Sequence, residues 1–258
     1  MEEILKYHED LNGKYLNESR LEKCAKKLMG KYRIKKKDAF YQIAEIEFYF
    51  YSPQHRDIIT YPRQCSEKLW FFHLSGVDLT IESLEKGLNP SFGGILIRSI
   101  IKYDETGKQL GTICGPQKCV NELFDVLNAV DNSNELTPLL EKHDFGSVEV
   151  VSTQRYISFK VPTKNYSGGN EKEYQDEIKK LVDTKLENII SQNQKLESNA
   201  SNKTEKWLIA SKYDNSDSFC DYLKAKYRYY LKNIQWEKEY KAANMDKGEN
   251  CYKYLLVT

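Results

Sequence analysis

The chain has 258 residues, of which 40% are hydrophobic and 30% charged, and its formal net charge is +1. This length suits one large domain, or one domain with an appendage, and a net charge this small neither requires nor excludes a nucleic-acid partner. No apolar run approaches the roughly 18 residues of a membrane helix. The opening MEEILKYHED is too polar for a secretory signal, so we expect a soluble, cytoplasmic protein without a membrane partner.

The cysteines are widely scattered and include no CxxC pair, so their spacing indicates neither a zinc site nor a redox motif. We interpret them as reduced thiols that pack mostly as small hydrophobic residues. No metal and no cofactor are expected. The six positions are Cys24, Cys65, Cys114, Cys119, Cys220 and Cys251.

Apolar residues at helical spacing predict a helix over residues 18–29, with Asn17 as its N-cap and Gly30 as its stop. A strand over residues 31–35 is expected to follow. The stretch from Lys23 to Lys37 is strongly basic. It is either a solvated face of this helix and hairpin or a patch that faces phosphate groups.

Period-two alternation predicts a strand over residues 41–51. Its even positions from 44 to 50 are apolar, and its odd positions place Glu45, Glu47 and Tyr49 on one side. A polar loop follows and contains His55.

Three segments further along predict more of a sheet. An aromatic strand covers residues 69–74, Gly76 breaks it, and residues 77–81 continue it. An almost wholly apolar strand covers residues 94–101 and includes Arg98. An unpaired buried charge is costly, so Arg98 needs a partner or a ligand.

Residues 107–114 are interpreted as a turn and connection, after which Gly115-Pro116 opens a helix. A polar loop then runs to His143. Residues 147–161 predict one or two strands with Arg155 near the middle.

The composition changes after residue 162, and three parts of the chain are distinguished. Residues 1–162 form a core, residues 163–218 form a helical and disordered insertion, and residues 219–258 complete the core with a terminal helix.

Several short segments, each weak alone, occur in an order typical of one family. They are AKKLMGKYR (25–33), AEIEFY (44–49), YPRQ (61–64), LWFFHLSGVDLTIE (69–82), ILIRS (95–99) and GPQKCVNEL (115–123), with weaker matches at RYI (155–157) and RYY (228–230). Together they resemble the alkyladenine (methylpurine) DNA glycosylases. The resemblance covers residues 21–161 and 219–232. It implies an α+β fold, a single mixed domain whose curved antiparallel β-sheet is flanked by helices, here with a helical insertion.

Enzymes of this family are monofunctional base-excision hydrolases that flip a damaged nucleotide out of the duplex and attack its sugar with an activated water. The resemblance assigns the general base to Glu47. It assigns stacking on the flipped base to Tyr49, with Phe72 on the opposite side. The alternatives are a solvated strand carboxylate for Glu47 and an ordinary sheet-face aromatic for Tyr49.

The same resemblance implies a binding role for three more residues. His55 would contact the base and the phosphate, Arg63 belongs to the segment after it, and Arg98 would lie at the rim of the active site. An ordinary loop position for His55 and a core ion pair for Arg98 are the alternatives.

Three positions depart from the family. Ser75 stands where the family has a tyrosine wedge, and a serine cannot replace a base in the stack. Asp78 and Glu82 stand where the family has a histidine and an asparagine, and two acids near a DNA-facing pocket would repel phosphate. The chain is therefore expected to be a divergent member that acts on single-stranded nucleic acid or a nucleoside-like substrate, or that has lost catalysis.

Three functions compete. The first is an N-glycosylase acting on DNA or a nucleoside-like ligand, and the second is a non-enzymatic module that binds a nucleobase or nucleic acid in the same pocket. The third is a metal-dependent nuclease built from Glu45, Glu47, Asp78 and Glu82.

Overall fold

The computed structural model describes residues 18–52, 55–57, 60, 63–84, 91–125, 137–155 and 225–236. The predicted insertion over residues 163–218 and the predicted terminal helix lie outside this range. The described elements, in chain order, are α2 Glu18–Lys31, β1 Tyr32–Lys36, β2 Ala39–Ser52, β3 His55–Arg56, β4 Trp70–His73, β5 Gly76–Leu84, β6 Ser91–Asp104, β7 Gln109–Cys114, α3 Pro116–Leu123, β8 Leu139–Lys142, β9 Val150–Thr153 and β10 Arg228–Leu231.

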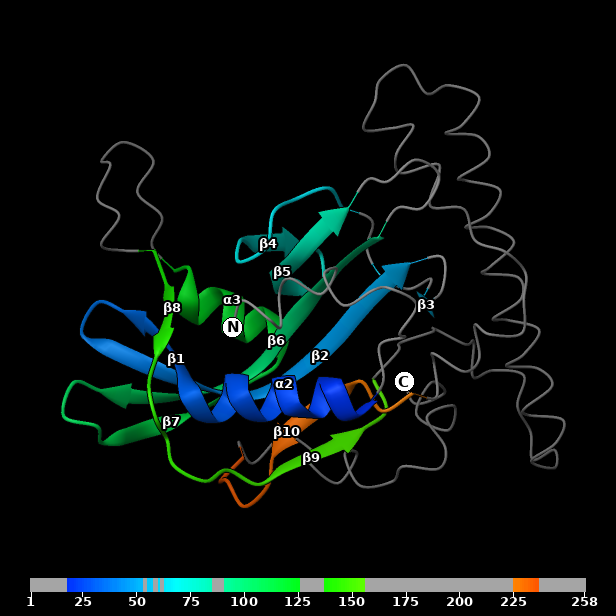
Figure 1. Cartoon of the computed structure of the whole chain (residues 1–258). Helices are drawn as coiled ribbons and strands as arrows, with labels where there is room; N and C mark the ends of the chain where they lie inside the picture. Colours follow the sequence, from blue (N-terminus) through cyan, green and yellow to red (C-terminus); the bar gives the residue numbers. More distant parts are fainter. Residues whose placement is uncertain are drawn as a thin grey trace, which may run out of the picture.

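The strands form one curled antiparallel sheet (Figure 1). Its main path runs β4-β5-β6-β2-β1-β8, while β7 pairs with β6, and β10 bridges β2 and β9. The long strands β2 and β6 pair along almost their whole length and make the centre of the sheet. The predicted α+β class with a curved antiparallel sheet is confirmed at this level.

The two described helices pack on the sheet through their apolar residues. Helix α2 buries Leu21, Cys24, Ala25 and Leu28 against β2, β1, β9 and β10. Helix α3 begins at Pro116, where the missing N–H leaves no helical bond unmade, and it packs on β5, β6 and β7. Both helices contribute side chains to one hydrophobic core with the central strands.

Two connections predicted from the sequence are strands instead. Residues 109–114 form β7 beside β6, and residues 139–142 form β8 beside β1. Each is short, and its apolar pattern is too brief to stand out locally, so pairing with a neighbour decides its conformation. The prediction that residues 77–81 continue the preceding strand is also wrong, because the chain reverses at Leu74-Ser75 and β5 runs antiparallel to β4.

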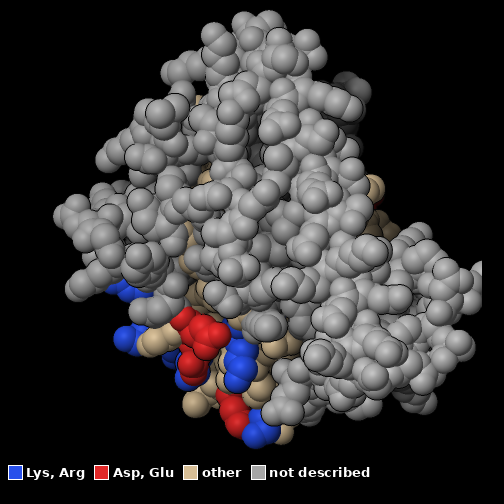
Figure 2. Space-filling view, turned by 90° about the vertical axis from the view of Figure 1, so that its right-hand side faces the viewer, with Lys and Arg blue, Asp and Glu red and all other residues tan. Residues whose placement is uncertain are grey.

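The basic stretch between Lys23 and Lys37 is interrupted by ion pairs. Lys31 pairs with Asp144, and Arg33 pairs with Glu141, each at 2.6 Å. The buried Lys36 pairs with Asp125. On the face drawn in Figure 2, described acidic and basic side chains likewise lie next to each other. The charges of this stretch therefore form a mixed surface more than a single-signed patch.

Neither of the described helices is long and apolar enough to cross a membrane.

Candidate functional site

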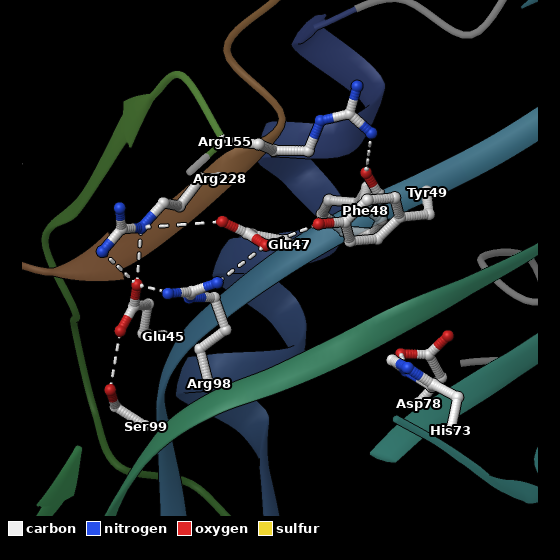
Figure 3. A network of polar contacts seen from close by, with 10 residues as sticks. All are labelled: Glu45, Glu47, Phe48, Tyr49, His73, Asp78, Arg98, Ser99, Arg155 and Arg228. Atoms are coloured by element: carbon white, nitrogen blue, oxygen red, sulfur yellow. Dashed lines mark hydrogen bonds and ion pairs between the residues drawn. The ribbon is translucent and has the colours of Figure 1, made fainter. Parts of the chain in front are cut away.

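The centre of β2 carries two buried carboxylates. Glu45 and Glu47 are each 0% exposed. They point to the same side of β2, toward Arg98 of β6 and Arg228 of β10 (Figure 3). The four formal charges balance, which is the condition under which buried ions persist in a core.

Arg98 bridges the two carboxylates. Its Nε donates to Glu45 Oε1 at 3.1 Å and its Nη1 donates to Glu47 Oε2 at 3.0 Å. The expected partner for this arginine is thus a pair of glutamates on the neighbouring strand. The side chain keeps 13% of its surface exposed, so the network lies at the edge of the core.

A local irregularity in the pairing of β2 and β6 makes this arrangement possible. The register shifts on both sides of the Glu45–Ser99 pair. Successive residues of a regular strand point to opposite faces, yet Arg98 and Ser99 both contact Glu45, the serine donating to Oε2 at 2.6 Å. The bulge therefore allows two consecutive side chains to reach one carboxylate.

Arg228 comes from the far end of the described chain. Strand β10 pairs with β2 so that Arg228 lies directly opposite Glu47. Its Nε donates to Glu45 Oε1 at 2.5 Å and lies 4.0 Å from Glu47 Oε1. Glu45 thus binds two guanidinium groups, whereas Glu47 is held mainly by Arg98 and by Tyr49.

Tyr49 donates its hydroxyl to Glu47 Oε2 at 2.8 Å. Burial, and then the negative charge of Glu47, raise the pKa of this hydroxyl well above its ordinary value, so it stays a donor at neutral pH. The guanidinium of Arg155 lies over the Tyr49 ring, 4.8 Å from its centroid. One face of the tyrosine is therefore already covered by a cation.

Arg155 is fully buried and is held in place from two sides. It pairs with Asp57 through both terminal nitrogens, at 2.5 and 2.9 Å, and Nη1 also donates to the Phe48 carbonyl. Its other aromatic neighbour is Tyr227, at 5.2 Å. The match at RYI therefore places an arginine behind the tyrosine, in a structural position.

His55 is buried, at 3% exposed, and does not project from a rim. Its ring stacks on Tyr227 and contacts Phe50 edge-on. Burial lowers its pKa from 6.5 to about 4, so the imidazole is neutral at physiological pH. In this position His55 packs in the core. A side chain that is this deeply buried offers almost no surface for the expected contact with phosphate.

A second polar cluster lies two strands away. The buried Arg63 pairs with Asp78 at 2.6 Å, and His73 Nε2 lies 3.0 Å from the other oxygen of Asp78. Arg63 also lies over the Phe71 ring at 4.3 Å. The expected repulsion of phosphate by Asp78 is therefore offset by its own arginine, while Glu82 lies half-buried further along β5.

The strand register shows that the two clusters share one face of the sheet. Glu47 pairs with Leu96, Leu96 with Asp78, and Asp78 with Phe71. Directly opposed residues place their side chains on the same face. We call the face that carries Glu47, Leu96, Asp78 and Phe71 the polar face.

Phe72 does not belong to the polar face. It pairs with Val77, one residue out of step, and its ring packs edge-on against Phe124 at 4.7 Å. It remains 48% exposed. The prediction that Phe72 opposes Tyr49 is corrected by the register, which places Phe71 on that face instead.

The structure brings the predicted residues Glu47, Tyr49 and Arg98 into contact, with Arg98 in ion pairs to buried glutamates. Several of their partners were not predicted from the sequence. Asp57 and Ser99 gave no signal, since neither residue type is distinctive in its segment. Arg155 and Arg228 were visible only as weak matches. Phe71 was not predicted, because which of two adjacent phenylalanines lies on a given face of a sheet is known only when the strand register is known.

Each of Glu45, Glu47 and Asp78 is paired with arginine, an arrangement unlike that of carboxylates that bind a divalent cation. Within the described ranges no group of three or more His, Cys, Asp or Glu residues is placed to hold a metal ion. A hollow of about 590 Å³ lies elsewhere, and Lys26, Gln42 and Lys232 are among its lining residues.

Fold and site together define a class: an α+β protein with a curled antiparallel sheet and a charge-balanced pair of glutamates on its central strand. Comparisons with protein-family models, with curated proteins and with solved structures found no match to this chain.

Proposed function

We propose that the chain is a divergent protein of the alkyladenine DNA glycosylase type, which hydrolyses an N-glycosidic bond with a water activated by Glu47. The observation that carries the proposal is the position of Glu47. Its carboxylate lies on the polar face and is oriented by Arg98 at 3.0 Å and Tyr49 at 2.8 Å. A general base must be held in this manner to act on a substrate atom.

The reaction needs only a carboxylate and water. The C1′–N bond breaks and its electron pair leaves with the base, while the water oxygen forms a bond to C1′ and its proton passes to Glu47. The sugar becomes positively charged on the way, and a fixed negative charge beside it stabilises that transition state. The hydrogen bonds from Arg98 and Tyr49 to Glu47 support this role for its carboxylate.

The base would bind against the aromatic residues of the polar face. Arg155 covers one side of Tyr49, so stacking of a base on this ring requires its other side. Phe71 lies on the same face, three strands from Tyr49, next to Arg63. Stacking on such rings contributes about 1–3 kcal/mol per base.

Burial favours a second candidate, a module that binds a nucleobase or nucleic acid without cleaving it. Glu47 is 0% exposed and its charge is compensated. A substrate reaches it only if this face opens. If the ion pairs of Glu47 only stabilise the fold, the polar face could bind a ligand but would have no general base.

Glu47→Gln separates the two candidates. Single- and double-stranded oligonucleotides carrying a methylated purine are incubated with the protein, released base is measured by chromatography, and binding by fluorescence anisotropy. We expect base release to fall by at least about 100-fold with little change in affinity, because general-base catalysis contributes factors of about 10²–10⁴.

Two further variants make the result interpretable. Glu47→Asp keeps the charge but retracts it, so it should also lose base release, and its thermal melting shows whether the network survives. Glu141→Gln changes a surface carboxylate paired with Arg33 and should have no effect. Undiminished release by Glu47→Gln would sink the hydrolase proposal, and affinity for the oligonucleotides without any release by the parent protein would support the binding module.

A further inference from the structure

A hollow of about 590 Å³ lies beside helix α2, and none of its described lining residues belongs to the two clusters of the polar face. Its walls come from segments that are remote in sequence: Lys26 of α2, Gln42 of β2, the connection between β8 and β9, and the chain that follows β10. Gln42 precedes Glu47 on β2 by five residues, which is about 17 Å of strand. Ligand pockets typically measure about 300–1,000 Å³, so this hollow has the size for a small molecule.

Hydrogen bonds and close packing hold the walls of the hollow in place. The connection between β8 and β9 passes the C-terminal end of α2 (Figure 1), where the Phe145 N–H donates to the Gly30 carbonyl at 2.9 Å. A Cβ on Gly30 would lie 2.9 Å from Val148, so the helix and this connection are in close contact. The Lys232 N–H donates to the Glu149 carbonyl at 2.9 Å. Walls that are formed in advance lower the entropic cost of binding a ligand.

Gln42 brings a buried amide to the lining of the hollow. The residue is 5% exposed, its Nε2 donates to the Met29 carbonyl at 3.1 Å, and its Oε1 accepts from the Tyr103 hydroxyl at 3.2 Å. Burial raises the pKa of Tyr103, so this hydroxyl remains a donor at neutral pH. A primary amide has two N–H donors and two acceptor lone pairs. Its contacts within the described part of the chain therefore leave one N–H and one lone pair of Gln42 for a ligand.

Phe145 adds an aromatic ring to the same lining. His143 contacts this ring edge-on, with the two centroids 4.5 Å apart, and Tyr103 lies 5.9 Å from it. Tyr103 thus holds both the ring of Phe145 and the amide of Gln42. A planar ligand can stack on an aromatic ring while its edge hydrogen-bonds to a neighbouring amide.

The lining also carries a positive charge, because two of its residues are lysines and one is a glutamate. Glu149 already accepts from Lys232 at 2.6 Å and from Asn233 at 3.2 Å. Lys26 pairs with Glu22, four residues earlier on α2, and both side chains are about half exposed. Such an exposed pair is weak, so the Lys26 ammonium is available to an anionic group of a ligand.

We propose that this hollow binds a mononucleotide with an adenine base. The donor and acceptor of the Gln42 amide match N7 and the N6 amino group of adenine, the bidentate contact by which glutamine recognises this base. Phe145 provides a stacking surface for the base, and Lys26 provides a charge for the phosphate. The site goes beyond the proposed hydrolysis at Glu47 and does not depend on it.

Isothermal titration calorimetry of the full chain with adenosine monophosphate (AMP), inosine monophosphate (IMP), adenosine and inorganic phosphate tests the ligand. AMP should bind, and IMP should bind at least about fivefold more weakly, because its oxo group replaces the amino group that donates to Gln42. Adenosine and phosphate should each bind more weakly than AMP, since each lacks part of the contacts. Lys26→Gln should weaken AMP and leave adenosine unchanged. Lys23→Gln, an exposed lysine of α2 outside the lining, is the matched control.

Ser147→Trp tests the place of binding. Ser147 is an exposed residue of the lining, so a tryptophan there should fill the hollow and abolish AMP binding without lowering the melting temperature. Equal affinities for AMP and IMP, or AMP binding that survives Ser147→Trp, overturn the proposal. AMP binding that is lost in Tyr49→Ala but kept in Ser147→Trp also overturns it, because the nucleotide then lies on the polar face. A wild-type protein that binds no AMP overturns it as well, and base release from oligonucleotides decides the role of Glu47 separately.

Discussion

At the scale of single residues, the main feature of this protein is its buried ionisable side chains and the way each is stabilised. Glu45, Glu47 and Arg155 are each at most 1% exposed, and each has an oppositely charged partner at hydrogen-bond distance. His55 differs, since burial lowers its pKa to about 4 and keeps it neutral. Protonation of this histidine is therefore opposed by the folded state.

Acidification should destabilise the protein through His55. Its pKa is 6.5 in the unfolded chain and about 4 in the folded one, so the unfolded state binds the extra proton first. The contribution of His55 to the free energy of unfolding is complete above pH 6.5 and is lost as the pH falls toward 4. It totals about 3 kcal/mol. Urea unfolding at several pH values measures it.

His55→Phe keeps an aromatic ring against Tyr227 and should remove this part of the pH dependence. His143→Gln, which changes a half-buried histidine outside the site, should retain it. Identical pH profiles for wild type and His55→Phe would show that His55 does not carry the effect.

At the scale of the elements, close pairing of β5, β6 and β2 determines what fits on the polar face. Gly94 lies opposite both Tyr49 on β2 and Thr80 on β5. The absence of a side chain there leaves room for the ion pair between Arg63 and Asp78. Glycine at this position of β6 is therefore what allows the ion pair to be buried beside Tyr49.

Gly94→Ala should destabilise the fold by about 1–3 kcal/mol, as overpacking does in a close-packed core. The new Cβ would lie 2.6 Å from both Arg63 Nη1 and Asp78 Oδ2. The midpoint of chemical unfolding reports the loss. Gly111→Ala on β7 is the control, because no atom lies within 4 Å of its added Cβ, and a comparable loss in that variant would argue against a packing effect specific to Gly94.

Over the whole molecule, the site depends on segments that are far apart in sequence. Strand β10 pairs with β2 on one side and β9 on the other. It brings Arg228 to Glu45, 183 positions away along the chain. The central carboxylates therefore have all their ion-pair partners only after β10 has paired with β2.

A double-mutant cycle tests this long-range pair. Glu45→Gln and Arg228→Met should each cost about 3–5 kcal/mol, because each leaves a buried charge uncompensated. The double variant should lose less than the sum, with a coupling of about 1–3 kcal/mol in equilibrium unfolding. The exposed pair Glu149–Lys232, at the adjoining ends of β9 and β10, should couple by less than about 1 kcal/mol, and equal coupling in the two cycles would contradict the assigned importance of burial.

Local pattern alone was enough for the main elements. The apolar spacing around Leu21 and Leu28 predicted α2, the alternation of β2 placed Glu45, Glu47 and Tyr49 together, and the apolar run of β6 required a partner for Arg98. These features depend on side-chain periodicity within one element, which is written directly in the sequence.

Only the tertiary structure decided which elements meet and in what register. It selected Phe71 over Phe72 for the polar face, buried His55, turned two expected connections into β7 and β8, and supplied Arg228 from the distant strand β10. A shift of one residue moves a side chain to the other face of a sheet, and no local pattern records that choice. The residue types on β2 follow from the sequence, but their partners follow from strand pairing, because pairing is settled by contacts between segments that are remote along the chain.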